Sequence, residues 1–252
     1  MSSDFERQVT EGTAIPVSGW DFSPIEERWR RGNPPWNYAE ILREKMRTAA
    51  SMVDLGTGGG EFLASLAPLP RKSFATEGYP PNLAIAQRRL GPLGVRVLPI
   101  GPDLRIDLPD ATVDLVADRH EDFSGSEVRR ILTPGGWFVT QQVGGRNNVE
   151  LSQKFAARPP RPTNQISSSV ELAEEIAGAG LAIDCTKEAT YADEFLDIGA
   201  LVFYLRMIPW EVPGFSLDRH REPLREIYEE IERVGSFRVT THRLLVVAQR
   251  PG

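Results

Sequence analysis

The chain has 252 residues, of which 40% are hydrophobic and 25% charged, and its formal net charge is −6. This length suits one large domain, or a core domain that carries a substantial insertion, with ample material for a hydrophobic core. The acidic balance argues against nucleic acid as the partner, because nucleic-acid-binding proteins owe much of their affinity to Lys and Arg.

The cysteine content and the absence of apolar runs predict a protein of a reducing compartment. No apolar run approaches the roughly 18 residues of a membrane span. The first residues, MSSDFERQVTEG, are polar and acidic, unlike a signal peptide. Cys185 is the only cysteine, so the chain cannot form an internal disulfide. We therefore expect a cytoplasmic protein with no membrane partner, present as a monomer or homodimer.

Two short basic clusters interrupt this acidic sequence. Arg28, Arg30 and Arg31 form the first, and Arg158 and Arg161 form the second. Because both are short and mixed with proline, we interpret them as surface that faces solvent or a small anion. Nucleic-acid binding through these clusters is the minority alternative.

The N-terminal region is expected to form a helical cap over residues 1–48. Residues 1–22 look irregular, and Pro24 then suits the start of a helix that ends before GNPP. A second helix is expected from about Trp36 to Arg47.

From Ser51 onward, strand-like and helix-like segments alternate. Strands joined by helices of this length pair in parallel through right-handed crossovers, which predicts a doubly wound α/β sheet. The expected strands are 51–56, 73–78, 95–100, 112–119, 135–143, 181–191 and 242–250, and the intervening helices are 61–67, 82–90, 124–132 and 169–180.

Residues 195–236 interrupt this alternation before the last strand. They contain an apolar stretch, DIGALVFYLRMIPW, and a charged amphipathic helix, LDRHREPLREIYEEIERVG. An insertion at this point can project from the sheet toward the edge where ligands bind, so we expect a helical insertion on the substrate side.

The run DLGTGGGE, residues 54–61, is the strongest chemical signal. It follows a hydrophobic strand and opens a helix, where glycines allow a sharp turn and let a ligand approach bare backbone. An acid and three glycines at positions 54, 56, 58 and 60 resemble the E/D-x-G-x-G-x-G motif of class I S-adenosylmethionine-dependent methyltransferases. The third glycine falls one residue early for the G-x-G-x-x-G pattern of dinucleotide-binding enzymes.

Further segments resemble the same family in the same order. They are GPDLRIDLPDATVDLV (101–116) and ILTPGGWFVT (131–140), and the resemblance covers residues 50–142 well and the last strand loosely. It implies S-adenosylmethionine as the cofactor and S-adenosylhomocysteine as the product. It also implies a Rossmann-like sheet of seven strands, the last antiparallel, in a domain over residues 49–252.

The resemblance also implies how the cofactor is held. Glu77 would accept hydrogen bonds from both ribose hydroxyls, and Asp103 would accept the adenine amino group beside the N–H of Leu104. The implied cofactor-binding residues are Asp54, Gly56, Thr57, Gly58, Gly60, Glu77, Gly78, Asp103, Leu104, Asp118 and Tyr38.

Methyl transfer is an in-line displacement, so the enzyme must align a nucleophile and remove a proton where the nucleophile is OH or NH. The carboxyl end of the fourth strand is the expected place, and His120 there is the candidate base because imidazole titrates near neutral pH. A structural role for His120 is an equal alternative. Asp118 would orient His120 or contact the methionine moiety, and Arg119 would pair with a substrate carboxylate or with Glu121.

Aromatic side chains of the cap and the insertion are expected to shape an apolar pocket for a small molecule. The expected substrate-binding residues are Arg119, His120, Gln141, Trp36, Tyr204 and Trp210. No metal site is expected, because the acids at 193, 194 and 197 are explained more simply as a loop that caps a helix.

We therefore expect a methyltransferase that acts on an O or N atom of a small molecule, with the biosynthesis of a specialised metabolite as one interpretation of its role. Two alternatives stay open. A substantial basic face would favour methylation of RNA or protein. Cofactor binding with no pocket beside the methyl group would favour a catalytically silent regulatory protein.

Overall fold

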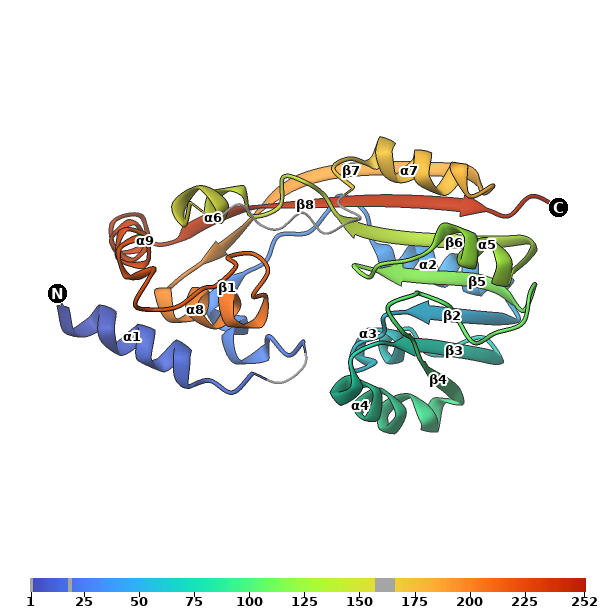
Figure 1. Ribbon diagram of the computed structural model, residues 1–252, viewed down its shortest axis with the longest axis horizontal. Helices are drawn as coiled ribbons and strands as arrows, with labels where there is room; N and C mark the ends of the chain where they lie inside the picture. The colour runs from blue at the N-terminus through green and yellow to red at the C-terminus, as the bar shows by residue number, and fades with distance from the viewer. Residues whose placement is uncertain (1, 18–19, 157–165) are drawn as a thin grey trace. The chain divides into compact units, whose positions relative to one another are not determined.

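The structure is a computed structural model that describes residues 2–17, 20–156 and 166–252 (Figure 1). The chain forms two compact units. The first, called the helical unit, comprises Met1–Pro34, Arg146–Gln165 and Thr190–His242. The second, called the sheet unit, comprises Pro35–Gly145, Ile166–Ala189 and Arg243–Gly252.

The sheet unit contains the alternating strands and helices expected from the sequence. Its elements are α2 (Tyr38–Met46), β2 (Ser51–Leu55), α3 (Glu61–Ser65), β3 (Lys72–Glu77), α4 (Pro80–Leu90), η2 (Gly91–Leu93), β4 (Val95–Pro99), β5 (Val113–Arg119), α5 (Gly125–Ile131), β6 (Leu132–Val143) and α7 (Ser169–Gly178). Strands β7 (Ala182–Phe195) and β8 (Phe237–Gln249) contribute residues to both units.

The strand order is β1-β7-β8-β6-β5-β2-β3-β4. Strands β4, β3, β2, β5 and β6 pair in parallel, whereas β6 and β8 are antiparallel. The predicted doubly wound sheet with an antiparallel last strand is therefore confirmed.

Within the described part of the chain, the sheet has eight strands instead of the predicted seven. The additional strand β1 (Trp29–Arg30) pairs antiparallel with the end of β7, Trp29 opposite Phe195 and Arg30 opposite Glu194. The helix expected from Pro24 is a short 3-10 helix, η1 (Ser23–Arg28), after which the chain becomes extended. β7 continues to Phe195 and offers an edge with which these two residues pair.

The central strands are buried on both faces. Met52 and Leu115 belong to a cluster that includes residues of α2, α3 and α4, whereas the adjacent Val53 and Val116 pack with residues of α5 and α7. Figure 1 shows α4 beside β4. This arrangement explains the near-continuous hydrophobic runs of these strands, because successive side chains point to opposite faces.

Helices α1 (Ser2–Ala14), α6 (Val149–Lys154), α8 (Ile198–Met207) and α9 (Arg221–Val234) form the helical unit together with η1 and β1. The sequence predicted irregular structure where α1 lies, and that prediction is wrong. Phe5 and Val9 occupy one face of α1 and are buried in the core of the unit. Two apolar residues in a polar segment are a weak periodic signal, so the helix depends on tertiary packing.

The segment 195–236 contains α8 and α9, as the predicted helical insertion requires. Asp197 is the N-cap of α8, and its carboxylate accepts the N–H of Ala200 at 2.9 Å. Arg28 forms an ion pair with the same carboxylate. Asp197 therefore caps a helix, as the sequence indicates, whereas Asp193 and Glu194 belong to strand β7 and not to a capping loop.

Candidate functional site

The carboxyl ends of the parallel strands bring the motif residues to one edge of the sheet unit. Leu55 of β2 lies opposite Asp118 of β5, and Arg119 lies opposite Gln141 of β6. The chain runs outward from β2 to β3 and β4 and then crosses back to β5, so the strand order reverses between β2 and β5. Ligands of open α/β sheets bind at such a reversal.

The glycine loop connects β2 to α3 in a conformation that side chains rarely adopt. Gly56, Gly58 and Gly60 have φ angles of 58°, 61° and 83°. The N–H of Gly56 donates to Oγ1 of Thr76 at 3.1 Å, and the N–H of Thr57 donates to the carbonyl of Thr76 at 2.8 Å. These bonds tie the loop to β3.

A substitution of Gly56 by Ala is expected to destabilise the protein by about 2 kcal/mol, because the new Cβ would combine a left-handed backbone with a collision against the Glu121 carboxylate. Gly94→Ala is the matched control, since Gly94 also has a positive φ of 77° but nothing within 4 Å of its added Cβ. Thermal unfolding of both variants measures the difference. Equal losses of stability would show that the contact with Glu121 has no effect.

Asp54, the residue before the last in β2, has a buried carboxyl group and is 5% exposed. Burial raises its pKa from the ordinary value of 3.8 to about 6, against the opposing effects of the Thr57 hydroxyl and the Arg119 charge. The Thr57 hydroxyl is also buried, and within the described part of the chain it makes no hydrogen bond of good geometry. The Asp54 carboxyl and the Thr57 hydroxyl can therefore each form a further hydrogen bond beside the glycine loop.

The stability of the ligand-free protein is expected to fall as the pH rises from about 4 to about 6. The folded state raises the pKa of Asp54, so its contribution is complete below the unfolded pKa and is lost as the pH passes through about 6. The loss amounts to about 3 kcal/mol. Asp54→Asn removes this titration, so the variant should gain stability over the wild type as the pH rises. Melting curves between pH 4 and 7.5 test this, and a pH-independent difference would contradict it.

Glu77 is the last residue of β3 and is 6% exposed. One carboxylate oxygen accepts the backbone N–H of Tyr79 at 2.7 Å. Burial raises the pKa of Glu77, although the N–H groups of Tyr79, Gly58 and Gly78 oppose this effect. The carboxylate therefore lies beside the glycine loop at the end of the adjacent strand, where the sequence predicts the ribose acid.

Asp103 lies in the loop between β4 and β5 and is exposed. Its Oδ1 accepts the N–H of Arg105 at 3.3 Å, and the N–H of Leu104 donates to the carbonyl of Gly101 at 3.0 Å. The carboxylate is thus oriented by its own loop, whereas the Leu104 N–H that was expected beside adenine is used within the turn. Leu104 has a φ of 55°.

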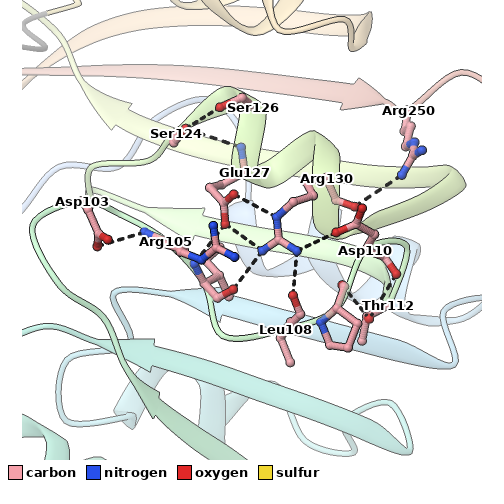
Figure 2. Close-up of polar contacts among 12 residues, drawn as sticks. Asp103, Arg105, Leu108, Asp110, Thr112, Ser124, Ser126, Glu127, Arg130 and Arg250 are labelled. Atoms are coloured by element: carbon pink, nitrogen blue, oxygen red, sulfur yellow. Dashed lines mark hydrogen bonds and ion pairs between the residues drawn. The ribbon is translucent and has the colours of Figure 1, made fainter.

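Arg130 of α5 fastens this loop to the sheet unit (Figure 2). It donates to the carbonyls of Ile106 and Leu108 and forms ion pairs with Asp110 and Glu127. Glu127 in turn accepts the N–H of Ile106 at 3.1 Å. The sequence-based reasoning missed Arg130, because nothing local distinguishes it from the neighbouring arginine.

Asp118 is fully buried at the end of β5. Its Oδ2 accepts the Thr140 hydroxyl at 2.9 Å and the Gln142 amide at 2.7 Å, and burial raises its pKa well above the ordinary value. The Tyr38 hydroxyl donates to the carbonyl of Asp118 at 2.8 Å and accepts its N–H at 3.1 Å. Tyr38, which was expected to contact the cofactor, therefore binds the backbone at the end of β5.

His120 follows β5 in a left-handed conformation, with a φ of 66°. The backbone N–H of His120 donates to the backbone carbonyl of Gln141 at 2.9 Å. The ring atom Nε2 of His120 lies 3.2 Å from the side-chain nitrogen Nε2 of Gln141. The indole N–H of Trp36 donates to Oε1 of the same Gln141 at 2.9 Å. Three predicted substrate-binding residues, Trp36, His120 and Gln141, are thus joined in one chain of hydrogen bonds.

No protein-family model and no curated protein matches the sequence. Solved structures match in fold. One is a putative methyltransferase of Bacillus halodurans, 16% identical, covering 84% of this chain and 100% of its own with a TM-score of 0.60. Geranyl diphosphate methyltransferase, solved with sinefungin, is 19% identical over 84% of this chain and 77% of its own, with a TM-score of 0.50. The cyclase SpnF is 14% identical over 99% of this chain and 94% of its own, with a TM-score of 0.54.

The chain has the S-adenosylmethionine-dependent methyltransferase fold. In this methyltransferase fold two charged residues beside the glycine loop have positions that the sequence did not predict. The Arg119 guanidinium lies over the ring of Phe62, 3.9 Å from its centre, and no ion pair with Glu121 is present in the described part of the chain. The Glu121 side chain instead packs against Gly56, where it occupies the space that a Cβ on this glycine would need. In the sequence, the only signal for the contact between Glu121 and Gly56 is the run of polar residues after β5.

The two remaining predicted substrate residues belong to the helical unit. Tyr204 is buried in α8 and accepts the Asn148 amide at 2.9 Å, whereas Trp210 is 48% exposed and packs edge-on against Trp20. Their role in substrate binding stays a prediction.

Within residues 2–17, 20–156 and 166–252, no group of His, Cys, Asp and Glu is arranged to hold a metal ion. Over the same ranges, no helix is both long and apolar enough to cross a membrane.

Proposed function

We propose that this protein is a methyltransferase that uses S-adenosylmethionine and acts on an O or N atom of a small molecule. The observation that carries the proposal is the glycine loop with three left-handed glycines, flanked by the buried Asp54 and Glu77 at the ends of adjacent parallel strands. A buried carboxylate needs hydrogen-bond donors, and ribose hydroxyls supply them.

The residues present fit this cofactor. Glu77 would accept the ribose hydroxyls, the bare backbone from Gly56 to Gly58 would contact the methionine part, and Asp103 on its fastened loop would accept the adenine amino group. The Glu121 carboxylate at Gly56 adds a negative charge suited to an ammonium group. S-adenosylmethionine supplies an electrophilic methyl group on a sulfonium centre.

The chain's own residues would orient the reactants and exclude water. Tyr38 and Thr140 hold the end of β5 and the Asp118 carboxyl in place, so this strand end is rigid where the methyl acceptor would lie. Such positioning accounts for most of what an in-line displacement requires. The raised pKa of Asp118 and its three hydrogen bonds suit a positioning group.

Isothermal titration with S-adenosylmethionine, S-adenosylhomocysteine and NADH tests the cofactor assignment. Micromolar binding of both sulfur ligands, with no binding of NADH, is expected. Failure of both sulfur ligands to bind would overturn the proposal, because it would mean that the glycine loop serves another purpose.

The ion pairs of the first basic cluster favour a small-molecule substrate over RNA or protein. Arg28, Arg30 and Arg31 each face an acidic residue, namely Asp197, Glu194 and Glu26. Paired arginines offer little net positive potential to phosphates. Arg158 and Arg161, the second cluster, lie outside the described residues. The neighbour named geranyl diphosphate methyltransferase is consistent with a small substrate.

A second candidate function is cofactor binding without methyl transfer. The specific observation in its favour is the cyclase SpnF, which shares the fold over 99% of this chain, because its name shows that this fold is not restricted to methyl transfer. The two candidates differ in one readout. Incubation with S-adenosylmethionine and substrate mixtures yields S-adenosylhomocysteine only from a methyltransferase.

A further inference from the structure

The hydrogen bond from Trp36 determines the orientation of the Gln141 side-chain amide. The Trp36 indole nitrogen can only donate a hydrogen bond, so the Gln141 atom 2.9 Å from it must be the amide oxygen. The amide NH₂ group of Gln141 therefore points to Nε2 of His120, at 3.2 Å.

This orientation determines the protonation of His120. Because the Gln141 NH₂ group can only donate, Nε2 of His120 must accept with its lone pair. A neutral imidazole that accepts at Nε2 carries its proton on Nδ1. The imidazolium form would place two donors face to face, so protonation would break the hydrogen bond to Gln141.

The surroundings of His120 reinforce this state. His120 is an exposed residue. Desolvation of its ring by the surrounding protein, and then the positive charges of Arg243 on β8 and Arg119 on β5, lower its pKa well below the ordinary value. Across the residues that the structure describes, Nδ1 has no hydrogen-bond acceptor. An N–H donor in a positive local field favours an oxygen that carries negative charge.

We propose that His120 is a specificity-determining hydrogen-bond donor, which holds an oxyanion of the substrate through Nδ1–H and does not act as the general base. This rests on the proposed function and names the substrate class as a molecule with a carboxylate or a comparable oxyanion. Such a nucleophile needs no base. The new O–CH₃ bond forms as the C–S bond breaks with its electron pair returning to sulfur, and no proton is released.

The protonation state of His120 is measurable without cofactor or substrate. Two-dimensional ¹H–¹⁵N spectra distinguish imidazole tautomers, and His120→Gln identifies the signals of this residue. The expected result is a neutral ring with Nδ1–H at pH 7 and a pKa below the ordinary value. An Nε2–H tautomer, or titration near pH 6.5, would overturn the proposal.

Gln141→Glu reverses the polarity of the contact. The new carboxylate would accept from Trp36 and also from a proton on Nε2, so the pKa of His120 should rise by about 1–3 units. Gln249→Glu is the matched control, because Gln249 contacts the carbonyl of Gly135 and is expected to leave the His120 signals unchanged. A Gln141→Glu variant that is well folded but keeps the wild-type titration would also contradict the proposal.

The oxyanion specificity is tested with two probes of similar size and opposite charge, benzoate and benzylamine. Benzoate should shift the Nδ1–H resonance of His120, and benzylamine should leave it in place. A shift with benzylamine alone, or with neither probe, would overturn the assignment. These readouts concern the imidazole ring, whereas titration with S-adenosylmethionine tests the proposed function, so failure of one is distinguishable from failure of the other.

Discussion

Replacing Glu77 by Gln is expected to weaken the binding of S-adenosylmethionine by about 10- to 150-fold. This range corresponds to the loss of about 1.5–3 kcal/mol, the usual contribution of hydrogen bonds to a charged group. The Gln side chain can still accept the N–H of Tyr79, which the Glu77 carboxylate accepts at 2.7 Å. It can no longer accept two ribose hydroxyls, because one of its terminal atoms becomes a donor.

The same substitution should not destabilise the ligand-free protein. Burial raises the pKa of Glu77, so the ionised carboxylate is held at a cost that Gln removes. The variant should therefore combine weaker cofactor binding with an unchanged or higher melting temperature. A general loss of structure cannot produce that combination.

Isothermal titration gives the affinity, and thermal unfolding without ligand gives the stability. Glu40→Gln is the control, because Glu40 is an exposed acid on α2 at some distance in the sequence from the loop. If Glu77→Gln binds S-adenosylmethionine as tightly as the wild type, Glu77 has no role at the ribose.

The parts of the site that local sequence determines could be predicted. The glycine loop requires left-handed residues between a strand and a helix, and Gly56, Gly58 and Gly60 supply them. Glu77 was predicted at a strand end, because Gly78 and the prolines at 80 and 81 end the strand-like segment. Both features depend on a few adjacent residues, so tertiary contacts do not change them.

The parts of the site that depend on pairing across the sheet could not be predicted. His120 meets Gln141 because Arg119 lies opposite Gln141 in the register of β5 and β6, and Trp36 reaches the same amide from the segment before α2. The three residues were expected near the substrate, but no sequence pattern states which atom donates to which. That direction changes the interpretation of His120 from a base to a donor.

Two elements of the helical unit illustrate the same limit. Helix α1 has mostly polar residues, and only the packing of Phe5 and Val9 shows why it is helical. Strand β1 consists of two residues that become a strand only because the end of β7 is available for pairing. A strand of two residues has no period, and the few apolar residues of α1 give only a weak helical one.

Replacing Arg130 by Lys is expected to lower the melting temperature by about 4–12 °C and to weaken cofactor binding. A guanidinium carries five N–H donors, and Arg130 uses all of them: Nε and Nη2 on Glu127, Nη1 on Leu108 and Asp110, and Nη2 also on Ile106. Lys has three donors and lacks the planar fork, so it cannot hold the two oxygens of Glu127 and the loop carbonyls together.

The size of the effect follows from burial. The side chains of Arg130 and Glu127 are 22% and 16% exposed, so the network lies between a surface ion pair and a fully buried one. Losing it leaves the Ile106 and Leu108 carbonyls short of a donor, for a total of about 2–3 kcal/mol. For a chain of this size, each kcal/mol lowers the melting temperature by about 2–4 °C.

Arg129→Lys is the matched control on the same helix. Arg129 is exposed, and its side chain makes one long hydrogen bond of 3.3 Å to the carbonyl of Gly180. Its replacement should change the melting temperature by less than about 2 °C. Hydrogen exchange of the Ile106 amide, which donates to Glu127, adds a local readout and should accelerate only in Arg130→Lys. Equal melting temperatures for the two variants, with unchanged exchange at Ile106, would mean that the loop bearing Asp103 is held by its own turns, and that the proposed adenine end of the site does not depend on α5.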